Sequence, residues 1–146
     1  MLPISKSDRV LVAIVDEAIN IASYRHLIED PDVGAHAWFE GVTRRMTGDL
    51  QTTQLSYEAF RPMAITQMDS IGEETLRQFG LYKVVIVHRL GVVAIGEASL
   101  IVGCSAAHRK TIFEALAIIV DRLKADVPIW KKETFVDGEE QWVHPT

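Results

Sequence analysis

The sequence predicts an α+β domain built on a mixed or antiparallel sheet with about three helices. Strands and helices are intermixed with hairpin turns, which differs from the strict βαβ alternation of a parallel sheet. Short β-branched apolar runs are interspersed with segments whose apolar residues recur at the helical period. With 146 residues and 48% apolar composition, the chain has the usual size of one domain and can bury its own core. We expect a single domain over residues 9–146 after a flexible arm over residues 1–8.

The amino-terminal part predicts one strand, one helix and then two further strands. Arg9 to Val15 is a short β-branched run typical of a strand, and Ile21 to Ile28 has apolar residues at helical spacing. Gly34 to Val42 and Gln51 to Phe60 alternate in the manner of strands. Because Thr47-Gly48-Asp49 between them is a turn sequence, we expect these two strands to pair as neighbours.

The clearest helix boundaries lie in the middle of the chain. Arg61-Pro62 opens a helix with proline at the first helical position, and Gly80 ends it as a left-handed cap. Three apolar runs follow, and we expect strands buried on at least one face over Leu81 to Leu90, Val92 to Ile95 and Ala98 to Cys104.

One more helix and a hairpin complete the predicted domain. Ser105 is a favourable N-cap for the last helix, and Pro128 prevents that helix from continuing. Ile129 to Phe135 and Gln141 to Val143 then predict two short strands joined at Asp137-Gly138, a hairpin-type turn.

Composition excludes several classes of function. A net charge of −5 gives no general reason to bind nucleic acid or an anionic membrane, so an anionic ligand must be held by local positive charge. The single cysteine, Cys104, excludes an internal disulfide and a cysteine zinc cluster, and its apolar neighbours favour a buried, inert thiol over a nucleophile. No apolar run reaches the roughly 18 residues of a spanning helix, and no secretory signal pattern is present. We expect a soluble, cytoplasmic protein.

Cations gather at both ends of the last predicted helix. His108, Arg109 and Lys110 fall in its expected first turns, where free N–H groups together with arginine and histidine make a plausible phosphate or carboxylate site. The alternative, that these side chains are solvated and pair with nearby carboxylates, is equally consistent with the pattern. The residues alone leave the two interpretations open.

Two lysines, Lys124 and Lys131, flank Pro128 at the other end of this helix. Ammonium groups that are close together and partly buried have lowered pKa values, which suits a proton donor or a nucleophile. A lysine near a helix end also stabilises the helix dipole, so the pattern alone favours a structural role for both. The pattern likewise favours a structural role for His88 and a core position for Trp130.

Six ordered blocks of sequence resemble the large, catalytic subunit of molybdopterin synthase, the MoaE family. The resemblance covers roughly residues 33–143, and the blocks are Gly41-Val-Thr-Arg44, Tyr57-Glu-Ala-Phe-Arg-Pro-Met63, His88-Arg-Leu-Gly91, Gly96-Glu97, Ser105-Ala-Ala-His-Arg109 and Leu123-Lys-Ala-Asp-Val-Pro-Ile-Trp-Lys-Lys-Glu133. It implies an α/β hammerhead-type domain that forms a homodimer, with a small subunit at each far end of a heterotetramer.

The resemblance also implies an activity and a partner. The family's enzyme is a sulfurtransferase that converts cyclic pyranopterin monophosphate into molybdopterin by installing two dithiolene sulfurs, in molybdenum cofactor biosynthesis. The sulfur comes from a thiocarboxylate on the C-terminal Gly-Gly of a small ubiquitin-like subunit, whose tail enters the pocket of the large subunit. No cofactor, metal, nucleic acid or membrane is implied.

Site residues follow from the same resemblance. It assigns catalytic roles to Lys124 and Lys131 and, as substrate-binding residues, Val42, Thr43, Arg44, His108, Arg109, Lys132 and Glu133. We hypothesise that Lys124 orients and activates the thiocarboxylate carbonyl, and that Lys131 supplies proton transfer or charge stabilisation. Family pockets lie near the dimer interface, which would let His108 and Arg109 serve the partner chain's site.

The chain departs from the family pattern at two places. Many relatives carry Asn where this chain has Arg45, before Met46, which affects the substrate contacts of that loop. Some relatives also extend beyond the position of Thr146 with a basic residue that reaches a neighbouring active site. The alternative function is a non-catalytic homologue that binds a ubiquitin-like tail or an anionic metabolite, and retention of both Lys124 and Lys131 argues against it.

Overall fold

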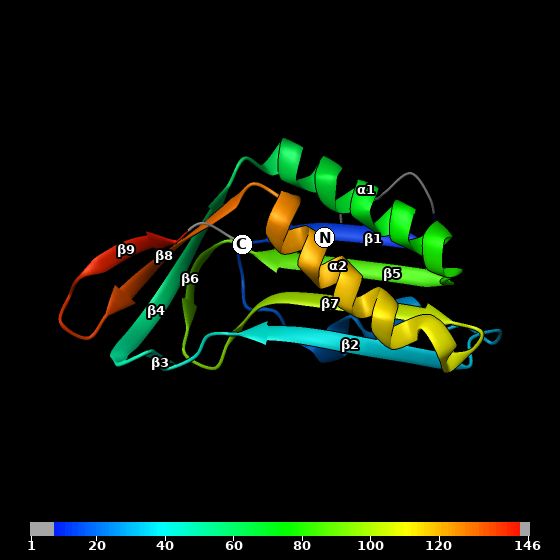
Figure 1. Ribbon diagram of the computed structural model, residues 1–146, viewed down its shortest axis with the longest axis horizontal. Helices are drawn as coiled ribbons and strands as arrows, with labels where there is room; N and C mark the ends of the chain where they lie inside the picture. Colours follow the sequence, from blue (N-terminus) through cyan, green and yellow to red (C-terminus); the bar gives the residue numbers. More distant parts are fainter. Residues whose placement is uncertain (1–7, 144–146) are drawn as a thin grey trace.

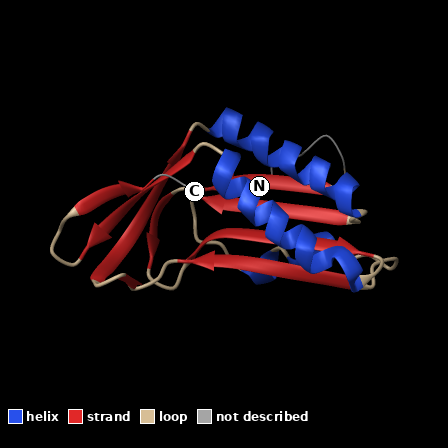
Figure 2. Ribbon diagram, in the orientation of Figure 1, coloured by secondary structure: helices blue, strands red, loops and turns tan. Residues whose placement is uncertain are grey.

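The computed structural model describes residues 8–143, so residues 1–7 of the expected arm lie outside the described part and Asp8 belongs to a turn. Two β-sheets and two α-helices make up the fold, together with three short 3₁₀ helices labelled η (Figures 1 and 2). In chain order the elements are β1 (Val10–Val15), η1 (Ile21–Ser23), η2 (Arg25–Ile28), β2 (Ala35–Val42), β3 (Met46–Thr47), β4 (Leu50–Ala59), α1 (Arg61–Phe79), β5 (Lys83–Arg89), β6 (Gly91–Ala94), β7 (Ala98–Ala106), η3 (Arg109–Thr111), α2 (Ile112–Asp126), β8 (Ile129–Phe135) and β9 (Glu140–Val143).

The larger sheet has the strand order β1-β5-β7-β2 and holds the core. β1 is parallel to β5 and the other pairs are antiparallel, so the sheet is mixed. Figure 1 shows α1 and α2 side by side on one face. The η1–η2 segment packs on the other face, which explains why every residue of β7 is buried. The predicted α+β class with a mixed sheet is confirmed.

The smaller sheet is antiparallel and lies beyond the end of the helices (Figure 1). Its strands follow the order β3-β4-β8-β9, and β6 also pairs with β4. The predicted hairpin around Asp137-Gly138 is confirmed as β8–β9, with Gly138 at a φ of 89°. Within the described residues, no helix is long and apolar enough to cross a membrane.

The predicted pairing of the strands before and after Thr47-Gly48-Asp49 is wrong. That turn joins β4 only to the two-residue β3, whereas β2 pairs with β7 in the larger sheet. The register of β2 shifts between Gly41 and Val42, and the chain leaves the larger sheet there. β2 therefore belongs to the larger sheet and β4 to the smaller one, and the segment between them joins the two sheets.

Helix boundaries follow the local signals at α1 but not at α2. Gly80 ends α1 with a φ of 62°, as predicted, and Pro62 is the second helical residue. Residues 21–28 form the two turns η1 and η2 in place of one continuous helix. Ser105 is not an N-cap, because it continues β7 in register with His36 and Lys83, and α2 begins only at Ile112. Sheet pairing on both sides of β7 outweighs the capping preference of one serine.

Gly72 allows α1 to approach β1 closely. A Cβ atom at this position would lie 2.5 Å from Cγ1 of Val10, closer than packed carbon atoms approach. We expect Gly72→Ala to lower the free energy of unfolding by about 1–3 kcal/mol through overpacking, although alanine is the better helix former by about 1 kcal/mol.

The same substitution made in a Val10→Ala background tests whether overpacking is the cause, with the free energy of unfolding measured by chemical denaturation. Removing the valine methyl groups should make Gly72→Ala neutral or stabilising, by up to about 1 kcal/mol. An equal loss of stability in both backgrounds would show that close packing against Val10 is not the reason.

Candidate active site

A cavity opens where the two sheets meet the end of α2. Its inner arm has a volume of about 170 Å³ and an outer arm of about 390 Å³ adjoins it. The two arms lie side by side and share six lining residues: Phe39, Gly41, Tyr57, Ser99, Lys124 and Lys131. Both lysines that the resemblance assigns to catalysis therefore lie at the point where the arms join.

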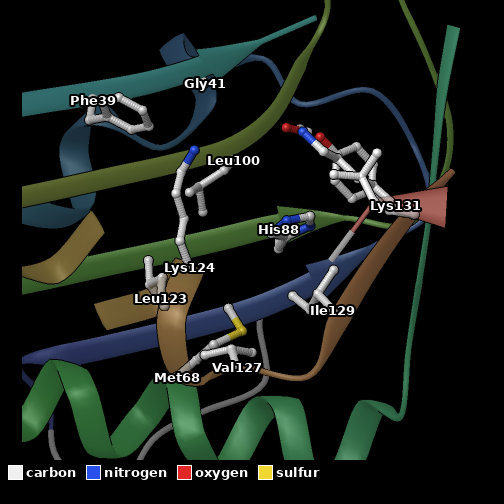
Figure 3. A pocket seen from close by; sticks show the side chains of 13 residues that line it. Phe39, Gly41, Met68, His88, Leu100, Leu123, Lys124, Val127, Ile129 and Lys131 are labelled. Carbon is white, nitrogen blue, oxygen red and sulfur yellow. The ribbon is translucent and has the colours of Figure 1, made fainter. Parts of the chain in front are cut away.

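The lysines approach this point from different elements. Lys124 belongs to the last turn of α2, and in Figure 3 its side chain extends toward Phe39 and Gly41. Lys131 belongs to β8, directly opposite Tyr57 of β4. Pro128 explains this arrangement, because it stops the helix and redirects the chain into the strand. The sequence thus converts neighbours along the chain into neighbours across a cavity.

The pKa of Lys131 is lowered below its ordinary value. Burial of its half-buried side chain is the largest cause, and the positive charges of Lys124 and Arg44 lower the pKa further. The carboxylate of Glu133 opposes these effects by raising it. Lys131 is therefore easier to deprotonate than an ordinary lysine, which suits a group that exchanges protons.

Glu133 is a buried carboxylate held by hydroxyl groups. Thr47 and Thr52 both donate their Oγ1 hydrogen bonds to its Oε2 atom, and the two hydroxyl oxygens lie 3.2 Å apart. Because residues two apart on a strand share a face, Glu133 projects to the same side of β8 as Lys131. It lines the outer arm and ties the loop between β2 and β4 to β8.

That loop carries the other nearby predicted residues. Val42 and Arg44 line the outer arm, where the guanidinium group adds positive charge at its mouth. Thr43 between them is buried: its N–H donates to the carbonyl of Glu97 at 3.1 Å, and its carbonyl accepts from the N–H of Gly96 at 2.9 Å. Thr43 thus holds the loop by its backbone while its neighbours face the cavity.

Lys132 lies on the opposite face of β8 from Lys131. Its ammonium group pairs with Glu140 at 3.4 Å and lies 5.6 Å from the centre of the Trp142 ring. Trp130, expected in the core, is on this face too and is 43% exposed. The alternation of a half-exposed strand explains both positions.

His108 and Arg109 are exposed and lie at the far end of α2 from the cavity. They precede the helix, with Arg109 in η3, so their predicted place in its first turns is wrong, whereas anion binding by these two residues stays a prediction. Lys124 is twelve residues beyond Ile112, which at 1.5 Å per residue is about 18 Å along the helix. The structure therefore does not bring His108 and Arg109 to the same chain's lysines.

Three polar residues that line the inner arm, Tyr57, His88 and Ser99, were not selected as site residues from the sequence. His88 lines the inner arm; its Nδ1 atom lies 2.8 Å from the carbonyl oxygen of Arg89, and its ring meets Tyr57 edge-on with centroids 5.0 Å apart. Ser99 hydrogen-bonds to the side chain of Tyr57. The only sequence signal for His88 was its place in a family-like block, because a histidine at a strand end is otherwise unremarkable.

Other candidate groups take no part in this cavity. Cys104 is buried, and burial raises its thiol pKa to about 12, so the expectation of an inert thiol is confirmed. Within residues 8–143, no group of three or more His, Cys, Asp or Glu side chains is placed to hold a metal ion. The chemistry available at the cavity is that of lysine, arginine, histidine, glutamate and hydroxyl groups.

Comparisons with known proteins agree on one family. The family model for the MoaE protein matches residues 14–126. The molybdopterin synthase catalytic subunit of Dictyostelium discoideum is 37% identical over 141 residues, which cover 94% of this chain and 89% of the relative. A solved structure of molybdopterin synthase from Staphylococcus aureus superposes with a TM-score of 0.84 at 36% identity, over 89% of this chain and 94% of that one.

A complex of subunits 1 and 2 of molybdopterin-converting factor from Helicobacter pylori has the same fold, with a TM-score of 0.72 at 20% identity over 91% of this chain and 88% of that one. The family-model match covers more than half of the chain, and the Dictyostelium relative matches it over 89% of that relative's own length. The chain belongs to the MoaE protein family, whose members are catalytic subunits of molybdopterin synthase and act in molybdenum cofactor biosynthesis.

Proposed function

We propose that the cavity transfers sulfur from the C-terminal thiocarboxylate of a small ubiquitin-like subunit to cyclic pyranopterin monophosphate. The observation that carries this proposal is the meeting of Lys124 and Lys131 at the junction of two arms. A cavity with two arms can receive two reactants from different sides. The phosphate and the thiocarboxylate are both anions, and the cations at the junction and at Arg44 complement them.

The reaction balances without an oxidant or a reductant. The thiocarboxylate sulfur forms a bond to a side-chain carbon of the pterin, and an oxygen leaving group departs from that carbon. Water then cleaves the bond between the acyl carbon and sulfur, so the tail leaves as a carboxylate and the sulfur stays on the product as a thiolate. Negative charge develops on the leaving oxygen and on the acyl oxygen, and nearby ammonium groups stabilise both.

The two lysines take different roles in this proposal. Lys124, at the exposed end of α2, orients the thiocarboxylate and stabilises charge on its carbonyl oxygen. Lys131 is half-buried with a lowered pKa, which supports proton transfer to the leaving group and from the attacking water. Glu133 accepts hydrogen bonds from two hydroxyl groups, so its role is to hold the wall of the outer arm and to raise the pKa of Lys131.

The proposed assembly is a homodimer with one small subunit at each far end, acting in the cytoplasm. The complex of two subunits known from Helicobacter pylori supports a small partner for this fold. Shared pockets would give His108 and Arg109 a role, since both are exposed and about 18 Å of helix separates them from their own lysines. We propose that they bind the pterin phosphate in the pocket of the second copy, and that Lys132 supports β8 from its outer face.

Alanine substitution of either lysine tests the proposed chemistry. Lys124→Ala and Lys131→Ala should each lower the rate of dithiolene formation about 10²- to 10³-fold, the usual effect of removing one charge-stabilising group. The rate is measured with thiocarboxylated partner and cyclic pyranopterin monophosphate in a single turnover. Lys83→Ala, which removes a lysine from the start of β5, serves as the control and should react normally. Near-normal transfer by Lys124→Ala would overturn its role.

The lowered pKa of Lys131 makes a second prediction. Lys124→Gln removes a positive neighbour and should raise the pKa of Lys131, whereas Glu133→Gln removes a negative one and should lower it further. The Lys131 side-chain amine is followed by NMR during a pH titration, with Lys83→Gln as the control. A lowered Lys131 pKa in Lys124→Gln, a raised one in Glu133→Gln, or no change in either variant would contradict the proposed electrostatics.

Hybrid dimers test whether each pocket draws residues from both chains. Lys124→Ala and Arg109→Ala chains, each inactive alone, are co-expressed with different tags and allowed to mix. In a two-fold dimer with shared pockets, half of the dimers are hybrids with one intact pocket each, so about a quarter of wild-type activity should return. If each chain completes its own pocket, every hybrid pocket carries one substitution and activity stays at the level of the single variants.

A further inference from the structure

His88 places a fixed hydrogen-bond acceptor in the inner arm. Its Nδ1 atom lies 2.8 Å from the carbonyl oxygen of Arg89, and a carbonyl oxygen can only accept, so Nδ1 carries the hydrogen. In a neutral imidazole the other nitrogen, Nε2, is then an acceptor. The edge-on contact with Tyr57 restrains the ring in this orientation. The structure gives Nε2 no partner among residues 8–143.

The surroundings of His88 are poor in other acceptors. The inner arm is mainly apolar, with walls that include Phe39, Met68, Leu100, Leu123, Val127 and Ile129, and Figure 3 shows His88 at the centre of this group. Protonated lysines at the junction can only donate, and the hydroxyl groups of Tyr57 and Ser99 already share a hydrogen bond, whereas Nε2 of His88 has no partner among the described residues. A ligand N–H group entering this arm gives up its water partners and needs an acceptor there.

His88 is also uncharged at neutral pH. Burial lowers its pKa to about 4, with the positive charge of Lys124 as a further cause. An uncharged ring adds no repulsion to a cavity that already holds two lysines. It accepts a hydrogen bond but is too weak a base to exchange protons efficiently at neutral pH.

We propose that Nε2 of His88 accepts a hydrogen bond from a backbone N–H of the small subunit's terminal Gly-Gly when the tail occupies the inner arm. This inference rests on the proposed function. Glycine residues suit an arm of about 170 Å³ because they bring no side chains, but each brings a peptide N–H that has to be paired. By pairing it, His88 fixes how far the tail enters and so sets the thiocarboxylate beside Lys124 and Lys131. His88 is thus a binding residue that selects the position of the tail.

Two substitutions separate the two ring nitrogens. His88→Asn keeps a polar group near the position of Nδ1 but leaves none at Nε2, whereas His88→Gln places an amide near Nε2. We expect His88→Asn to weaken binding of the small subunit, in its carboxylate form, about tenfold, and His88→Gln to stay within about threefold of wild type. Titration calorimetry measures the Kd, and thermal unfolding confirms that each variant is folded.

A change in the ligand makes the test independent of any variant's folding. Two semisynthetic small subunits each carry an ester oxygen in place of the N–H of one terminal glycine. One of them should bind the wild-type chain about tenfold more weakly than its parent and bind His88→Asn with no further loss. Equal binding of both esters and their parent, or an ester effect of the same size in His88→Asn, would overturn the inference.

The remaining outcomes are also decisive. If His88→Asn keeps its affinity for the small subunit but needs more pterin to reach half its maximal rate, Nε2 serves the pterin and the inference is wrong. Equal binding of the esters with normal dithiolene formation would overturn the role of His88 alone. If the wild-type chain neither binds the small subunit nor forms dithiolene, the proposed function fails and this inference fails with it.

Discussion

The fold has to hold several positive charges close together in a half-buried cavity. Lys124, Lys131 and Arg44 line it together, and like charges repel most where water is partly excluded. The structure meets this constraint by taking the charges from three elements and by fixing one carboxylate, Glu133, under two threonine hydroxyl groups. Burial, together with the repulsion that remains, lowers the pKa of Lys131. Anionic reactants relieve this repulsion, so the same excess of positive charge favours binding of the ligands that the proposed reaction requires.

Two junctions place these charges. Pro128 ends α2 and sends the chain into β8, which carries the lysines to opposite sides of the cavity. The shift at Gly41 and Val42 releases β2 from the larger sheet and sends Arg44 to the outer arm. Both junctions lie between the two sheets, so the site depends on how the sheets are joined more than on either sheet alone. The close approach of α1 and β1 at Gly72 steadies the larger sheet from its other edge.

The sequence predicted what local chemistry determines. Gly80 as a cap, the Asp137-Gly138 turn and the burial of Cys104 follow from neighbouring residues, and the structure agrees. Ser105 failed as an N-cap because β2 and β5 pair with it from distant parts of the chain, and the same kind of long-range pairing separated β2 from β4. Only the family resemblance selected Lys124 and Lys131 as catalytic candidates, since their spacing alone favoured a structural role. His88 was given a structural role because a histidine at a strand end does not reveal the cavity that distant elements form around it.

Reconstitution tests the central claim, that this cavity carries out sulfur transfer, most directly. The purified chain is mixed with a thiocarboxylated ubiquitin-like partner and cyclic pyranopterin monophosphate, and dithiolene formation is followed over a single turnover. We expect product to appear as thiocarboxylate is consumed, with partner carboxylate released in equal amount to the sulfur incorporated. No product, with a partner and pterin that react normally on another catalytic subunit, would contradict the account and favour a homologue that binds the tail without chemistry.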